Sequence, residues 1–154
     1  MNRMLPNLIA YIGTAAIGVV IVIMVILQLE NAKVDKFSES YVKLSMDLGN
    51  LSQDYQGKVG KWKLKEYDNK TMASITDAYL PKFQEMANKV ENLNPPDRFK
   101  KTVEFSVKSI QSEMQSYMHF RNFLITNNPK ENETSNALLS DAQKYETYAI
   151  DNFK

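Results

Sequence analysis

The hydrophobic positions near the start of the chain form one unbroken apolar segment. From Leu8 to Leu27 no charged residue occurs, and twelve of these 20 residues are Leu, Ile or Val. As a helix the segment would be about 30 Å long, which matches the hydrocarbon core of a bilayer. A strand of that length is rare, so a buried strand is excluded. The pattern predicts a transmembrane helix, and we assign residues 1–29 to a membrane anchor.

A cleavable signal peptide is the alternative for this segment. It requires a shorter apolar core followed by small residues at a cleavage site. Here Glu30, Asn31 and Ala32 follow the core, so a charge stands where a small neutral residue is needed. We therefore expect the anchor to be retained in the mature protein.

The charges beside the anchor bear on its orientation. Arg3 precedes it without any acidic residue, whereas Glu30 follows it, and this favours a cytoplasmic N-terminus. Lysines further along the chain favour the opposite orientation, but acidic residues lie among them and reduce this effect. We expect a single-pass protein of the cell membrane with its C-terminal part outside the cytoplasm. Three glycosylation sequons, at Asn50, Asn69 and Asn132, agree with that side.

Small side chains recur within the anchor. Ala10, Thr14 and Gly18 are spaced four residues apart, which places them on one helix face that a second helix can approach closely. The alternative is that Ala and Gly are simply common in membrane helices. The first interpretation predicts integral membrane protein subunits as partners, in addition to the lipid bilayer.

After the anchor, apolar residues recur every three or four positions, which is the period of an amphipathic helix. The pattern predicts four helices, over residues 34–55, 72–93, 99–126 and from about 134 to the C-terminus. No Pro or Gly precedes Gly49 in the first of them, so the anchor can continue directly into it. Short connections between four amphipathic helices favour an antiparallel up-down bundle. We therefore predict an all-α protein in which residues 30–154 form an extramembrane four-helix bundle.

Glycines and prolines predict where these helices end or bend. Gly57 and Gly60 mark the end of the first helix. Pro81 predicts a kink in the second helix, or a break into two shorter helices. Residues 94–97 (Asn-Pro-Pro-Asp) form a corner, and residues 127–133 form the last turn. In an up-down bundle, the corner and the C-terminus return to the end at which the first helix begins.

Composition removes several classes of function. The chain has 19 basic and 18 acidic side chains, which gives no electrostatic reason to bind nucleic acid. It has no Cys, so disulfides, thiolate metal sites and cysteine nucleophiles are excluded.

The one histidine, His119, is not part of a di-iron motif, because Ser116 stands where such a bundle needs Glu. We expect His119 to be a partly exposed helix residue. Charged residues such as Lys144 and Glu146 are predicted to lie on a solvated face. We expect no enzyme activity and no cofactor.

A copper site is one hypothesis for the methionines. Met114, Met118 and His119 lie within two turns of one predicted helix, and Met72 and Met86 lie on the preceding one. Thioethers and imidazole are suitable ligands for Cu(I). The alternative is that these methionines fill irregular gaps in a bundle core.

The sole tryptophan, Trp62, stands in a basic stretch, KVGKWKLKEY. Such a stretch is suited to an anionic membrane or an acidic partner. A helix over residues 34–55 would hold it about 30 Å from the bilayer, which argues against the membrane. Two interpretations remain: a partner contact centred on Trp62, or a solvated turn with Trp62 packed over the end of the bundle.

The layout of the chain resembles small membrane proteins of ammonia-oxidising archaea, including the accessory single-span subunits of their copper-dependent ammonia monooxygenase. The likeness lies in the uncharged N-terminal span, the helical part rich in Lys, Asn and Ile, and a Pro-Pro corner before a long helix, PPDRFKKTVEFSVKSIQSEMQSY. The resemblance implies a structural subunit beside catalytic ones, with the copper and ammonia chemistry elsewhere. It implies no active-site residue in this chain.

These observations favour a non-catalytic accessory or assembly subunit of a membrane protein complex, which docks through its transmembrane helix and helical ectodomain. The alternative is a membrane-anchored helical bundle that binds a ligand or handles copper.

Overall fold

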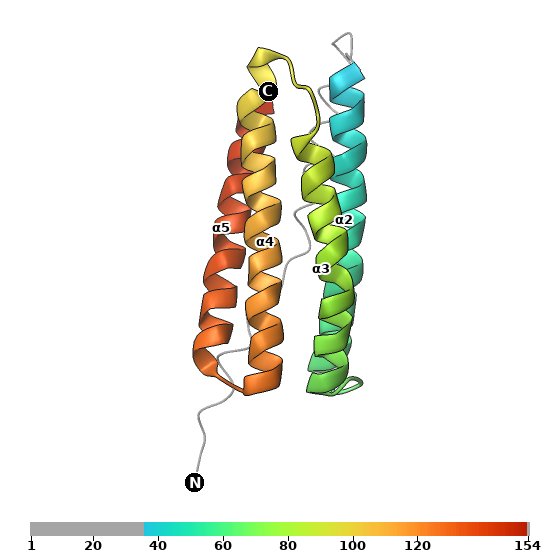
Figure 1. Ribbon diagram of the computed structural model, residues 1–154, viewed down its shortest axis with the longest axis vertical. Coiled ribbons are helices and arrows are strands. Elements are labelled where there is room, and N and C mark those ends of the chain that lie inside the picture. The colour runs from blue at the N-terminus through green and yellow to red at the C-terminus, as the bar shows by residue number, and fades with distance from the viewer. Residues whose placement is uncertain (1–35, 154) are drawn as a thin grey trace.

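The computed structural model describes residues 36–153, which form a bundle of four helices (Figure 1). The helices are α2 (Lys36–Lys63), α3 (Asn69–Glu91), α4 (Lys100–Thr126) and α5 (Pro129–Phe153), and a short 3-10 turn, η1 (Asp97–Phe99), precedes α4. No strand occurs over residues 36–153. The prediction of an all-helical bundle is confirmed.

The chain reverses direction at each connection, so the helices run up and down alternately (Figure 1). One end of the bundle contains the start of α2, the connection between α3 and α4, and the end of α5. We call this the proximal end, and the end with the other two connections the distal end. Within the bundle, the predicted return of the Pro-Pro corner and the C-terminal helix to the start of the first helix is confirmed.

The predicted anchor, residues 1–29, and its small-residue positions Ala10, Thr14 and Gly18 lie outside the described residues. The continuity of the anchor with α2 lies outside them as well. Over residues 36–153, no helix combines the length and apolar character needed to cross a bilayer.

The predicted end of the first helix at Gly57 and Gly60 was wrong. α2 continues through both glycines to Lys63. Each glycine costs a helix interior roughly 1 kcal/mol, but the apolar stripe continues through this stretch, and Val59, between the two glycines, is 1% exposed. Burial of this stripe outweighs the local preference of glycine. The helix ends instead where Lys65 adopts a left-handed backbone conformation, with φ 62°.

Of the two outcomes predicted at Pro81, a kink or a break, the break was wrong, because α3 is one continuous helix from Asn69 to Glu91. The kink stays a prediction. Pro81 lies on the exposed side of α3, between the buried residues Tyr79 and Phe83. A proline leaves the carbonyl four residues earlier without its helical partner. That carbonyl belongs to the exposed residue Asp77, where water can bind it.

The last turn is shorter than predicted. α4 ends at Thr126 and is capped by Asn127, which has φ 53°, and α5 begins at Pro129 rather than near Thr134. Proline suits the first position of a helix because its missing N–H would be unpaired there in any case. The side chain of Asn128 caps the helix by accepting a hydrogen bond from the Lys130 backbone N–H at 3.1 Å.

α4 and α5 are the most closely packed pair of helices. Small side chains at their contact make this possible. The Ser109 hydroxyl donates to the carbonyl of Ala142 at 2.8 Å, and the Ser116 hydroxyl donates to the carbonyl of Ser135 at 2.7 Å. α2 packs less closely on the rest of the bundle.

The core of the bundle has a distal and a proximal part. The distal core consists of Tyr55, Val59, Met72, Ala73, Tyr79, Phe83, Tyr117, Phe120 and Leu124. The proximal core consists of Phe37, Tyr41, Ala87, Val90, Phe99, Val103 and Ile110. Leu48 packs against both parts.

Four aromatic rings close the proximal end. Phe37, Tyr41, Phe153 and Phe99 form a closed cycle in which neighbouring ring centroids are 5.0–5.8 Å apart. The rings come from α2, α5 and the turn before α4, so they join three parts of the chain that are far apart in sequence. Their burial fixes the end of the bundle at which α2 begins.

Thr102 is a buried hydroxyl whose replacement should stabilise the bundle. Its side chain is 0% exposed, and its hydroxyl has no hydrogen-bond partner in the described part of the chain. Thr102→Val keeps the shape and removes the unpaired group, so we expect the free energy of unfolding to rise by about 1 kcal/mol in urea titrations.

The matched control for Thr102 is Ser106→Ala, one turn further along α4. The Ser106 hydroxyl is paired with the Tyr41 hydroxyl at 2.8 Å and with the Thr102 carbonyl at 2.8 Å. Its removal should lower the free energy of unfolding by about 1 kcal/mol. A loss of stability in Thr102→Val as well would show that its hydroxyl is paired in solution.

Candidate functional site

A polar seam lies inside the bundle where α2 faces α4 and α5. Helix α2 contributes Tyr41, Ser52 and Gln56, α4 contributes Ser106, Glu113 and Tyr117, and α5 contributes Glu146. We call these seven residues the acidic seam. Within the described bundle, the seam contains carboxyl groups whose pKa values are raised by burial between helices. It is therefore the candidate functional site.

Glu113 is the centre of the seam. Its Oε1 atom accepts hydrogen bonds from the Ser52 hydroxyl at 2.9 Å and from the Tyr117 hydroxyl at 2.5 Å. The Gln56 side-chain amide in turn donates to the Tyr117 hydroxyl at 3.1 Å. The side chains of α2 and α4 thus meet through a connected set of hydrogen bonds that ends on one carboxylate.

The two carboxyl groups of the seam have perturbed acidities. Burial raises the pKa of Glu113, while the hydrogen bonds from Tyr117 and Ser52 lower it. Burial, and secondly repulsion from Glu113, raises the pKa of Glu146 to about 8. No basic side chain among the described residues contributes to either shift. The raised pKa favours the protonated form of Glu146 at pH 7.

The chemistry open to this arrangement is the binding and release of a proton. A carboxyl group with a pKa of about 8 changes its charge close to neutral pH. No basic side chain among the described residues lowers this pKa by stabilising the charged form. Among residues 36–153, no three His, Cys, Asp or Glu side chains gather as metal ligands would. Perturbed carboxyl groups of this kind mark candidate functional sites.

The prediction that Glu146 lies on a solvated face was wrong. Its side chain is half-buried, and this burial is the main cause that raises its pKa. The signal was present in the sequence, because Glu146 falls between Ala142 and Ala149 on the apolar stripe of the last helix. Glu113 lies in the same way on the stripe that contains Ile110 and Tyr117.

Trp62 packs over the distal end of the bundle. Its ring meets Phe120 edge-on with centroids 5.2 Å apart, and its Nε1 atom donates to Asn69 Oδ1 at 2.9 Å. The indole is half-buried between residues of three helices, while Lys61 and Lys65 beside it are exposed. Trp62 is therefore packed over the end of the bundle beside a solvated turn, as one of the two interpretations predicted. The other, a partner contact centred on Trp62, stays a prediction.

The predicted copper ligands do not share one environment. Met114 is half-buried against the distal core, Met118 is 47% exposed, and Met72 and Met86 are buried in α3. His119 is partly exposed, as predicted, and its Nδ1 atom lies 2.7 Å from Glu131 Oε2. The copper site stays a prediction.

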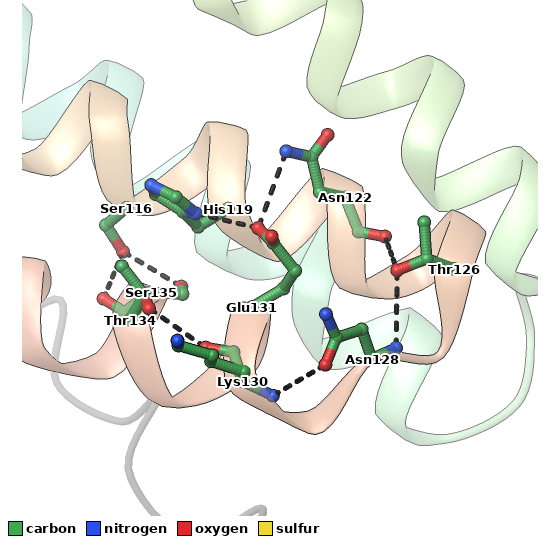
Figure 2. A network of polar contacts seen from close by, with 9 residues as sticks. All are labelled: Ser116, His119, Asn122, Thr126, Asn128, Lys130, Glu131, Thr134 and Ser135. Atoms are coloured by element: carbon green, nitrogen blue, oxygen red, sulfur yellow. Dashed lines mark hydrogen bonds and ion pairs between the residues drawn. The ribbon is translucent and has the colours of Figure 1, made fainter.

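His119 takes part in the polar network that fixes the α4–α5 connection, which Figure 2 shows from close by. The hydrogen bond from His119 is the main cause that lowers the pKa of Glu131, and Asn122 Nδ2 donates to the same carboxylate at 3.5 Å. Next to them, the Asn128 backbone N–H donates to the Thr126 hydroxyl at 3.2 Å. These contacts give His119 a structural role at the turn.

The three sequons differ in exposure. Asn50 lies exposed on α2, whereas Asn69 is half-buried and accepts from Trp62. Asn132 is 7% exposed within α5. In the folded chain, Asn50 is thus the most accessible of the three.

Comparison with protein-family models, curated proteins and solved structures finds no match.

Proposed function

We propose that this chain is a non-catalytic accessory or assembly subunit of a membrane protein complex. Residues 1–29 hold it in the cell membrane with a cytoplasmic N-terminus, and the bundle lies outside the cytoplasm. The observation that carries the proposal is the uncharged segment Leu8–Leu27, which is separated from the start of α2 at Lys36 by only a short stretch. A folded bundle so close to an apolar segment of this length is suited to work at a membrane surface.

The geometry of the bundle supports this proposal. The start of α2, the corner before α4 and the end of α5 lie together at the proximal end (Figure 1). Partner subunits embedded in the same membrane can reach this end. The distal end lies about 40 Å further away, because α2 has 28 residues with a rise of about 1.5 Å each.

The resemblance in layout to accessory subunits of archaeal ammonia monooxygenase supports the same role. In that setting the copper and ammonia chemistry would belong to other subunits. This chain would contribute helix contacts within the membrane, through Ala10, Thr14 and Gly18, and the surface of its bundle outside.

Membrane attachment is tested by extraction. The full chain should stay in the membrane fraction after an alkaline carbonate wash. Val19→Arg combined with Ile23→Arg should move it to the supernatant, because each arginine costs about 3 kcal/mol at the centre of a spanning helix. The control carries two arginines at exposed positions of α2, Met46→Arg with Gln53→Arg, and should stay with the membrane. Release of the unmodified chain by carbonate would contradict the proposed anchor.

Partner binding is tested by native mass spectrometry after mild detergent extraction. The full chain should be found with at least one other membrane protein. Gly18→Leu should weaken that association by blocking the close approach of a second helix. Ala16→Leu, on the opposite face of the same predicted helix, is the control and should leave it intact. A solitary monomer from gently extracted membranes would count against an accessory subunit.

A further inference from the structure

Three aromatic side chains lie together at the surface of the bundle, where α4 and α5 pack against each other. Phe105 of α4 stacks on Tyr145 of α5 with centroids 6.4 Å apart, and its centroid lies 5.3 Å from that of Tyr148. None of the three belongs to the distal or the proximal core, and Tyr148 is 40% exposed. We call Phe105, Tyr145 and Tyr148 the outer aromatic face. Burial in the core does not account for it.

The outer aromatic face lies near the proximal end of the bundle. Phe105 is five residues from the start of α4 at Lys100, and Tyr148 is five residues from the end of α5 at Phe153. With a rise of about 1.5 Å per residue, both side chains are attached about 8 Å from that end. The face is therefore in the part of the bundle that the proposed function places closest to the membrane.

Lysine side chains accompany the aromatic rings. The Nζ atom of Lys108 lies 5.5 Å from the centroid of the Phe105 ring, and that of Lys144 lies 6.0 Å from the centroid of the Tyr148 ring. The exposed Lys101 lies one helical turn before Phe105. Aromatic rings that keep one edge in water, together with lysines, are typical of surfaces at the headgroup level of a bilayer.

The charges along α4 favour anionic headgroups. Residues 97–108 carry four basic and two acidic side chains. Both acidic ones lie in ion pairs within this stretch, Asp97 with Lys100 at 2.7 Å and Glu104 with Lys108 at 2.6 Å, so an excess of positive charge remains. The exposed charged groups that α5 adds near the face are Asp141, Lys144 and Asp151.

The chain between the apolar segment and the bundle limits how far the bundle can be from a bilayer. The apolar segment ends at Leu27, and α2 begins at Lys36. Nine residues span at most about 30 Å even when fully extended. A membrane that holds the apolar segment is therefore within reach of the proximal end, and this step rests on the proposed function.

We propose that the outer aromatic face and the basic first turns of α4 lie against the anionic lipid headgroups of the membrane that carries the chain. The three rings enter the headgroup layer, where the tyrosine hydroxyls stay hydrated. Lys101 and Lys108 extend along the surface towards the lipid phosphates. The contact turns the half of the bundle formed by α4 and α5 towards the membrane and leaves the half formed by α2 and α3 facing away from it (Figure 1).

The experiment uses single fluorescent labels on the full chain, because its sequence contains no cysteine. Thr147→Cys places a label beside Tyr148, and Ser74→Cys places the same label at an exposed site in the distal half of α3. Each labelled chain is inserted singly into nanodiscs of phosphatidylcholine and phosphatidylglycerol that contain a lipid with a spin-labelled headgroup. The spin label should quench the fluorophore at position 147 several-fold more than that at position 74. Equal quenching would overturn the lipid contact.

Substitutions assign the quenching to the aromatic face. Tyr145→Ser with Tyr148→Ser should remove most of the excess quenching at position 147. The control, Met118→Ser with Ile125→Ser, changes two exposed apolar residues in the distal half of α4 and should leave the quenching unchanged. Circular dichroism checks that both variants are folded. Quenching that persists after the tyrosine substitutions would contradict the proposed face.

Charge reversal tests the role of the lysines and needs no change in the aromatic rings. Lys101→Glu with Lys108→Glu should lower the quenching at position 147 in nanodiscs that contain phosphatidylglycerol, and much less in nanodiscs of phosphatidylcholine alone. An equal effect in both lipids would overturn the preference for anionic headgroups. Carbonate extraction of the same labelled chains tests the anchor separately. A chain that resists extraction but shows equal quenching at the two labels loses the lipid contact of the bundle and keeps the proposed anchor.

Discussion

Replacing Phe83 with Ala should lower the free energy of unfolding by about 3–5 kcal/mol. Phe83 is 0% exposed in the distal core, and its ring centroid lies 5.2 Å from that of Tyr117 and 6.3 Å from that of Tyr55. The substitution removes the apolar burial and both ring contacts, and it leaves a cavity among residues of three helices. Because α3 carries Phe83 into contact with α2 and α4, the loss should affect the whole bundle in one transition.

The matched control is Phe105→Ala on α4. Phe105 is half-buried, and its partners Tyr145 and Tyr148 lie on the α5 surface, with centroids 6.4 and 5.3 Å away. We expect a loss of about 1 kcal/mol, because this side chain already meets water. Urea unfolding followed by helical circular dichroism measures both variants. Equal losses would mean that the distal core is not the main source of stability.

The arrangement of the helices was predictable because burial in a bundle imposes a regular period on each helix. Phe83, Val90, Phe99 and Ile110 all fall on stripes of apolar residues spaced by three or four, and all four are buried. Four such stripes with short connections leave few ways to bury them all. The three-to-four-residue spacing therefore identified most of the core residues, although it does not show which helices pack against each other.

The ends of the helices were less predictable, because local preferences compete there with burial. Gly57 and Gly60 disfavour a helix by about 1 kcal/mol each, yet the burial of Val59 and the packing of Trp62 outweigh them. Pro129 was assigned to a turn, although a proline suits the first position of a helix just as well. In each case the tertiary contact that decides the outcome is invisible in a local stretch of sequence.

The acidic seam could be predicted only in part. The stripe positions of Glu113 and Glu146 indicate that both side chains face inwards, but the period of a helix does not say which neighbour they meet. Ser52 on α2 and Glu113 are 61 residues apart in sequence, and only the folded bundle brings them within 2.9 Å. The position of Trp62 was easier to interpret, because a large aromatic side chain beside a turn can be buried mainly against the end of the bundle.

The free energy of unfolding should decrease as the pH rises from 5 to 8. Glu146 titrates near its ordinary value of 4.5 when the chain is unfolded, and at about 8 when it is folded. Between these values the folded state binds more protons than the unfolded state, so raising the pH favours unfolding. The full shift corresponds to at most about 5 kcal/mol, and we expect on the order of 3 kcal/mol because the half-buried side chain keeps some contact with water.

Glu146→Gln should remove most of this dependence on pH. Glutamine resembles the protonated carboxyl group, so the variant should match the unmodified chain at pH 5 and exceed it in stability at pH 8. Urea unfolding at half-unit steps of pH gives both curves, and Glu133→Gln, at an exposed position of α5, supplies the control with an unaltered slope. A rise in stability between pH 5 and 8 would mean that Glu146 is ionised in the folded chain. Parallel curves for the two proteins would place the titrating group elsewhere than at Glu146.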